Sequence, residues 1–134
     1  MGAQVPVELK LLMAAIVIGF VQIVWAAVAG SGGERNFAWL AGPRDEAKPV
    51  GVVAARLDRA LKNFLETFPL FAAALIACVA AGKLGPQTLY GSAVYVVARA
   101  LYVPVYAAGI PVLRTLIFAA SVVGIAMVMM AFFK

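Results

Sequence analysis

The chain has 134 residues, of which 65% are hydrophobic and 13% are charged, with a formal net charge of +5. A soluble domain is about half apolar and about a quarter charged, and one of this size still exposes roughly a third of its unfolded surface, so the composition excludes both a soluble monomer and a disordered chain. The 11 Lys and Arg residues form no basic tract, which argues against nucleic-acid binding. The chain has one cysteine and no histidine, which excludes an internal disulfide, a thiolate cluster and histidine-ligated zinc.

Long uncharged runs indicate four membrane-spanning helices. Residues 11–33 carry no charge, and a helix needs about 20 apolar residues to cross a bilayer. The apolar run 67–82 is shorter, so its helix is expected to begin upstream, in a charged segment. Gly109 and Pro111 separate the last two helices, because Pro111 suits a first helical turn. The predicted spans are about 7–29, 53–82, 87–108 and 112–133.

These spans predict an all-α fold, a single transmembrane domain over residues 1–134 built as an up-down four-helix bundle. The links after the second and third spans are short, which makes neighbouring helices antiparallel. The one long loop, about 30–52, and the start of the second span together carry more cations than the opposite side. These cations are Arg35, Arg44, Lys48, Arg56, Arg59 and Lys62, against Lys10, Lys83 and Lys134. The loop is therefore expected to be cytoplasmic and both termini outside, as in a bacterial inner-membrane protein.

Polar side chains lie in stripes on the second and third spans. Arg59, Asn63 and Glu66 fall within about 60° of one another at 100° per residue. The third span has a similar stripe, and Arg114 lies close to the start of the fourth. The stripe on the third span is Tyr95, Arg99, Tyr102 and Tyr106, at spacings of four, three and four. Ionisable groups inside spans usually face the bundle interior or a wet cavity, so the stripes predict a polar cleft open toward the long loop.

Structural explanations exist for some of these charges. Arg56 and Lys62 are near a helix end and can extend to the lipid headgroups. Arg99 can pair with Glu66 simply to hold two helices together. Tyrosines can be residues of an interfacial belt, but three on the face of Arg99, spread over about 16 Å of helix, are too many for belt anchors.

Three other features invite mainly structural interpretations. Gln22 is the only strongly polar side chain within the first span and is expected to hydrogen-bond across helices, with a reach into the polar cleft as the alternative. Cys78 is expected to pack as an inert small residue, because a reactive thiolate needs a positive, partly wet site. Ser121 and Gly124 are a candidate site of close helix packing.

Two stretches resemble the family of membrane-associated proteins in eicosanoid and glutathione metabolism (MAPEG), in particular bacterial-type members similar to microsomal glutathione transferases. One is Arg59-x-x-x-Asn63-x-x-Glu66-x-x-Pro69, and the other is Ala98-Arg99-x-x-Tyr102-x-x-x-Tyr106 followed by Arg114. The four-span layout with a long first loop also matches, so the resemblance covers nearly the whole chain.

The resemblance implies a homotrimer that binds glutathione as a co-substrate in a cleft between subunits. It implies that Arg59 holds a carboxylate, Asn63 the γ-glutamyl backbone and Glu66 the ammonium group. It also implies hydroxyl contacts from Tyr102 and Tyr106, while Arg99 supports the carboxylates or neutralises Glu66. The catalytic role falls to Arg114, because a cation lowers the pKa of the thiol and the thiolate is the nucleophile. The implied activity is that of a glutathione transferase or peroxidase acting on hydrophobic electrophiles or lipid hydroperoxides from the bilayer.

Two other functions compete with this one. A non-catalytic member of the same kind would be a membrane scaffold or lipid-binding protein without glutathione dependence. A small four-span exporter would carry a lone carboxylate within its first span, whereas here the acid is Glu66 in the second span and is accompanied by cations.

Overall fold

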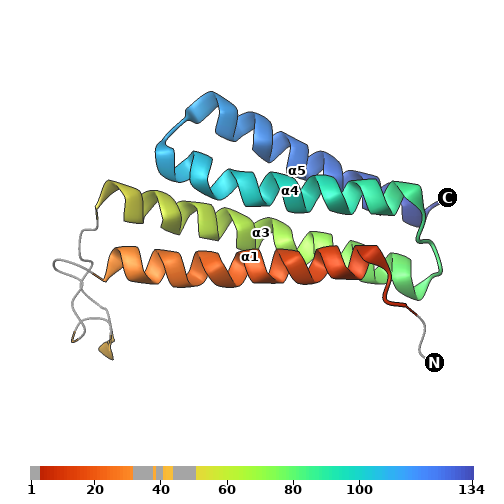
Figure 1. The fold of residues 1–134 in the computed structure, drawn as a ribbon, viewed down its shortest axis with the longest axis horizontal. Coiled ribbons are helices and arrows are strands. Elements are labelled where there is room, and N and C mark those ends of the chain that lie inside the picture. The colour runs from red at the N-terminus through yellow and green to blue at the C-terminus, as the bar shows by residue number, and fades with distance from the viewer. Residues whose placement is uncertain (1–3, 32–37, 39–40, 44–50) are drawn as a thin grey trace.

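The computed structural model describes residues 4–31, 38, 41–43 and 51–134, and four long α-helices make up most of them (Figure 1). The helices are α1 (Val7–Gly30), α3 (Val52–Ala80), α4 (Pro86–Ala108) and α5 (Pro111–Phe132). Each is long and apolar enough to cross a membrane, and the described part of the chain contains no strand. The predicted all-α, four-span fold is therefore confirmed. Three of the cations used to orient the bundle, Arg35, Arg44 and Lys48, lie outside the described residues.

The helices run alternately up and down (Figure 1). The end of α1, the start of α3 and the α4–α5 turn lie at one end of the bundle, called here the loop end; the start of α1 and the end of α5 lie at the other, the terminal end. Helix α4 contacts all three of the others, and α3 does the same, whereas α1 and α5 do not touch within the described residues. The centre of the bundle is therefore the α3–α4 pair.

Local chemistry sets both ends of α4. At its start the hydroxyl of Thr88 accepts a hydrogen bond from the backbone N–H of Gly85 at 2.8 Å, which satisfies a donor that the helix leaves unpaired. At its end Gly109 adopts a left-handed conformation, with φ of 77°, which glycine takes without steric cost. Pro111 then begins α5, as its fixed φ predicts.

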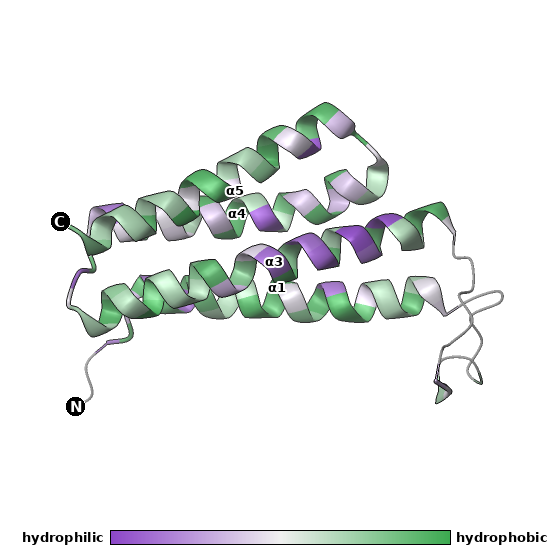
Figure 2. Ribbon diagram, turned by 180° about the vertical axis from the view of Figure 1, so that it is seen from behind, coloured by the Kyte–Doolittle hydropathy of each residue, from purple (hydrophilic) through white to green (hydrophobic). Residues whose placement is uncertain are grey.

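The main hydrophobic core occupies the terminal end. Its buried residues are Ala15, Phe71, Leu75, Cys78, Tyr95, Val96, Ile125, Val128 and Ala131. A smaller cluster of Ala26, Leu57 and Val103 lies nearer the loop end. Many large apolar side chains are exposed on the helices, and Figure 2 shows hydrophobic residues, in green, along most of their length. Lipid is therefore the natural solvent for this exterior.

Helices α4 and α5 meet closely at Gly91 and Gly124. A Cβ atom on Gly124 would lie 2.7 Å from the carbonyl oxygen of Gly91, and one on Gly91 would lie 2.9 Å from that of Gly124. Only glycine allows two backbones this close. From this contact the helices diverge toward the loop end, as Figure 1 shows, and we call the space between them the α4–α5 wedge.

Candidate functional site

The polar side chains of three helices converge at the loop end of the bundle. Figure 2 shows the hydrophilic stretch of α3 in its first half, beside the polar position in the middle of α4. A hollow of about 250 Å³ opens there, and we call it the polar pocket. Its lining residues are Asn63 from α3, Tyr102 and Tyr106 from α4, and Arg114, Thr115 and Phe118 from α5. Polar residues from the two predicted stripes, on the second and third spans, thus line one hollow together with Arg114 of the fourth.

Arg99 lies beside the polar pocket and has no solvent-exposed surface. Its Nη1 donates a hydrogen bond of 2.7 Å to the side-chain oxygen of Asn63, so it fixes an amide that lines the pocket. Its guanidinium carbon is 4.2 Å from the centre of the Tyr102 ring and 5.7 Å from that of Phe64, distances at which the ring faces attract a cation. Its Nε and Nη2 have no hydrogen-bond partner among the described protein atoms.

Tyr106 connects two further cations. Its hydroxyl accepts a hydrogen bond of 3.1 Å from Nε of Arg59, and the guanidinium of Arg114 lies 4.7 Å from the centre of its ring. The ring of Tyr102 meets that of Tyr106 edge to face, with centroids 5.5 Å apart. Three arginines from three helices therefore surround two phenols in edge-to-face contact, which concentrates positive charge at the site.

Arg56 links the start of α3 to the end of α4. Its Nη1 donates to the backbone oxygen of Ala107 at 3.3 Å, so it binds a carbonyl in the last turn of α4. A side chain at Gly109 would collide with the same guanidinium, which would lie 2.7 Å from the added Cβ. Arg56 and Gly109 thus hold the start of α3 against the α4–α5 turn.

Comparison with known proteins agrees with this architecture. The model of the MAPEG family matches residues 11–133 of the 134. The chain belongs to the MAPEG family. This family includes glutathione transferases and related enzymes. No curated protein matches the chain.

The motif residues behind the MAPEG resemblance take different positions. Asn63, Tyr102, Tyr106 and Arg114 line the polar pocket, while Arg99 and Arg59 contact pocket residues. Glu66 instead lies exposed on the outside of α3, and within the described residues it forms no ion pair with Arg99. The hydrogen-bond partner of Arg99 is Asn63, so an Arg99–Glu66 pair does not hold these helices together.

Tyr95 belongs to the core of this MAPEG chain and not to its pocket. Its ring stacks on that of Phe71, with centroids 4.2 Å apart, and its hydroxyl lies 3.0 Å from that of Thr67. The stripe on α4 therefore divides in two: its first member stabilises the terminal end, and its later members serve the loop end.

Two pocket residues, Thr115 and Phe118, have no counterpart in the sequence prediction. Thr115 follows Arg114 directly, and Phe118 lies one turn after it, so both share the exposed start of α5 with the predicted catalytic residue. The site was predicted from polar side chains, so the aromatic Phe118, one turn after Arg114, was not singled out. It reaches the pocket because its ring packs near that of Tyr102, with centroids 6.4 Å apart.

Proposed function

We propose that this MAPEG protein is a membrane glutathione transferase or peroxidase that acts on hydrophobic electrophiles or lipid hydroperoxides. The observation that supports this best is the polar pocket, where Asn63 and two tyrosines lie among three arginines. Glutathione carries two carboxylates, one ammonium group and a thiol, so it is a net anion with many hydrogen-bonding groups. An excess of cations beside amide and phenol groups suits such a ligand.

The size of the pocket is consistent with part of the tripeptide. Its volume of about 250 Å³ lies just below the roughly 300–1,000 Å³ typical of small-molecule sites. A complete glutathione would extend beyond it over the adjoining face of α3, where Arg59 and Glu66 are exposed. An exposed glutamate on a membrane-spanning helix is costly against lipid, so we propose that a neighbouring copy covers this face in a homotrimer.

Each motif residue has a role in this proposal. Arg59 binds a carboxylate through its planar guanidinium, and Glu66 accepts the ammonium group. Asn63 binds the γ-glutamyl backbone, held in position by the bond from Arg99. Tyr102 and Tyr106 donate hydroxyl hydrogen bonds.

Arg114 is the proposed catalytic residue. It is half-buried at the start of α5 and lies over the ring of Tyr106, so its charge faces the pocket. There the cation stabilises the thiolate over the thiol, which lowers the pKa of the thiol and makes the nucleophile available at neutral pH. We further propose that the loop end faces the cytoplasm, where glutathione is made, and that the protein resides in a bacterial inner membrane.

Thermal unfolding in detergent tests glutathione binding. A ligand at about 100 times its dissociation constant stabilises the folded state by about 2.7 kcal/mol, so millimolar glutathione should raise the midpoint of the parent protein. Arg59→Ala and Glu66→Gln should abolish the rise. Lys10→Ala, which removes an exposed charge at the terminal end, is the matched control and should keep it.

The outcomes separate the two leading functions. A rise in the parent and in Lys10→Ala, absent from both site variants, supports the glutathione enzyme. The absence of any rise in the parent protein, with co-purifying lipid, would instead support a non-catalytic scaffold.

A further inference from the structure

A hollow of about 460 Å³ lies at the terminal end of the bundle, where the link between α3 and α4 meets the end of α5 (Figure 1). We call it the terminal hollow. Its charged lining residues are Lys83 and Lys134, and its uncharged polar lining residues are Gln87 and Thr88. The polar pocket lies at the opposite end of the bundle, so the two hollows are separate sites.

The way α3 ends fixes the backbone of Lys83. Gly82 takes the left-handed conformation, with φ of 68°, and its N–H donates to the backbone oxygen of Val79 at 3.2 Å. The N–H of Lys83 then donates to the backbone oxygen of Cys78 at 2.8 Å. These two bonds close the last turn of the helix and satisfy its free carbonyl groups. The Lys83 side chain therefore starts from a fixed point beside the hollow.

Hydrogen bonds bring the second lysine to the same place. Gln87 at the start of α4 donates from Nε2 to the backbone oxygen of Met127 on α5 at 2.9 Å, which holds its amide in position. Its Oε1 accepts a hydrogen bond from Nζ of Lys134, and Nζ of Lys83 donates to the backbone oxygen of Lys134. Two ammonium groups, one before α4 and one after α5, are thus held at one hollow.

The charges at the terminal hollow are unbalanced. None of its lining residues is acidic, and the nearby carboxylate of Glu8 is buried behind Thr88, whose hydroxyl lies 3.4 Å from its Oε1. The ammonium groups of Lys83 and Lys134 repel each other across the hollow. Each has three N–H donors, and the hydrogen bonds within the described residues use one of each. Donors and charge therefore remain for an anion that has several acceptor oxygens.

The terminal hollow lies at the depth of the lipid headgroups. Helix α5 has 22 residues, which is about 33 Å at 1.5 Å per residue and close to the roughly 30 Å of a hydrocarbon core. Residues beyond its end at Phe132, including Lys134, therefore lie where the headgroups begin. Lys83 lies at the same end, after α3 and before α4.

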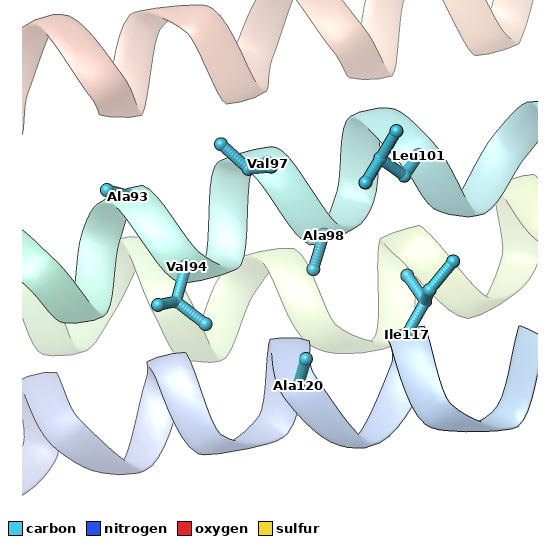
Figure 3. A pocket seen from close by; sticks show the side chains of 7 residues that line it. All are labelled: Ala93, Val94, Val97, Ala98, Leu101, Ile117 and Ala120. Carbon is cyan, nitrogen blue, oxygen red and sulfur yellow. The ribbon is translucent and has the colours of Figure 1, made fainter. Parts of the chain in front are cut away.

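A hollow in the α4–α5 wedge shows the contrast. Figure 3 shows Val94 and Ala98 of α4 pointing toward Ile117 and Ala120 of α5, and every side chain that lines it is apolar. That hollow offers no group that could hold an anion, whereas the terminal hollow combines two cations with an amide and a hydroxyl.

We propose that the terminal hollow binds the phosphate group of an anionic membrane lipid. A phosphate offers strong acceptor oxygens to both lysines and reduces their mutual repulsion, and lysine is a common phosphate-binding residue. The volume of about 460 Å³ falls within the roughly 300–1,000 Å³ of small-molecule sites, so a headgroup fits. A bound lipid would also join the α3–α4 link to the end of α5. This binding is independent of the proposed glutathione chemistry.

Thermal unfolding of the detergent-solubilised protein tests the proposal. Titration with phosphatidylglycerol gives the lipid concentration at half of the maximal rise in midpoint. Phosphatidylcholine with the same acyl chains carries a phosphate without net charge and is the comparison lipid. Glycerol 3-phosphate is the soluble probe, which offers the same phosphate chemistry without a membrane anchor.

The variants separate a local site from general surface charge. The site variant combines Lys83→Gln with Lys134→Gln, and Lys83→Arg with Lys134→Arg keeps both charges. Lys10→Gln is the matched control, because it removes the same charge from an exposed position at the same end. Lys10 lies about 200° around α1 from Glu8, which faces Thr88, so it points away from α4. Oligomeric state and the midpoint without lipid are measured first for every variant.

Phosphatidylglycerol should raise the midpoint of the parent protein at lower concentrations than phosphatidylcholine, and glycerol 3-phosphate should have no effect. A lysine near an anionic lipid contributes about fivefold in affinity, equivalent to about 1 kcal/mol, so the double glutamine variant should need about 25-fold more phosphatidylglycerol. The double arginine variant and Lys10→Gln should each stay within about twofold of the parent protein, since a charge on the far side of α1 is screened from the hollow. If the double glutamine variant does not fold, the two single glutamine variants replace it, each with an expected loss of about fivefold.

Four results would overturn the proposal. They are an unchanged phosphatidylglycerol affinity in the glutamine variants, an equal loss in Lys10→Gln, equal effects of the two lipids, and a rise with glycerol 3-phosphate as large as that with phosphatidylglycerol. The second would mean diffuse surface attraction, and the fourth would assign the hollow to a soluble phosphate compound. Glutathione binding at the loop end is measured separately, so none of these results bears on the proposed function.

Discussion

The two ends of the bundle differ in packing and polarity. The terminal end packs Phe71 against Tyr95 and presses the backbones of Gly91 and Gly124 together. The loop end holds a fully buried arginine, Arg99, and lets α4 and α5 diverge. Buried charge and diverging helices lower the stability of the loop end, and close packing at the terminal end compensates for this loss. The bundle can therefore hold a polar pocket at one end because the other end is packed without one.

The largest effect is expected at the terminal end, from Gly124→Leu. A side chain there meets backbone atoms of α4, with Gly91 O at 2.7 Å and Tyr95 N at 2.8 Å, so no rotamer relieves the collision. We expect a loss of folding free energy of about 3 kcal/mol or more, seen as loss of the native state in an SDS titration. Val123→Leu, at an exposed position of the same helix, should change stability by less than about 0.5 kcal/mol. Normal folding of Gly124→Leu would contradict the close approach.

At the loop end, Arg114→Ala should leave the fold intact and remove activity. Loss of a preorganised charge at a reacting group typically lowers kcat about 100-fold or more. The titration midpoint of bound glutathione, followed by thiolate absorbance, should rise in Arg114→Ala because the thiolate is no longer stabilised by a nearby cation. Arg114→Lys should recover part of both effects, since it keeps the charge. An unchanged thiolate titration in Arg114→Ala would transfer the catalytic role to another residue.

Also at the loop end, Asn63 supplies the hydrogen-bond acceptor of the buried Arg99 side chain. Asn63→Leu removes the 2.7 Å hydrogen bond and should destabilise the protein by about 1–3 kcal/mol. Asn63→Asp keeps an acceptor and adds the opposite charge, so it should be at least as stable as the parent protein in the same SDS titration. Equal destabilisation by both substitutions would mean that the bond from Arg99 contributes nothing.

The sequence predicted the helices of both ends better than it predicted the contacts between them. Span positions follow from long uncharged runs, and Gly109 and Pro111 marked the α4–α5 turn, so hydropathy and backbone chemistry sufficed for the fold. The stripe on α4 correctly grouped Tyr102, Tyr106 and Arg99. The same spacing included Tyr95, which faces the core, because periodicity gives the side of a helix and not which neighbour covers it.

The sequence alone did not identify which side chains contact each other across helices. Opposite charges favoured Glu66 as the partner of Arg99, yet Asn63 takes that place, and a difference of three residues on α3 decides it. The contribution of Phe118 to the polar pocket depends on the divergence of α4 and α5. That divergence starts from the contact between Gly91 and Gly124 at the terminal end. The residue pattern of one helix does not reveal a contact between two helices.

The smallest effect is expected from Gln22 on α1, in the loop half of the bundle. Its side chain is 2% exposed, and neither amide atom has a hydrogen-bond partner among the described protein atoms, contrary to the expected bond across helices. A buried amide in this state destabilises the fold, so Gln22→Leu should raise the free energy of unfolding by about 1 kcal/mol. Ile23→Leu, at the exposed next position, is the control and should be neutral. If Gln22→Leu is less stable than the parent protein, the amide is hydrogen-bonded in the membrane, and the polar region of the loop end extends across the bundle to α1.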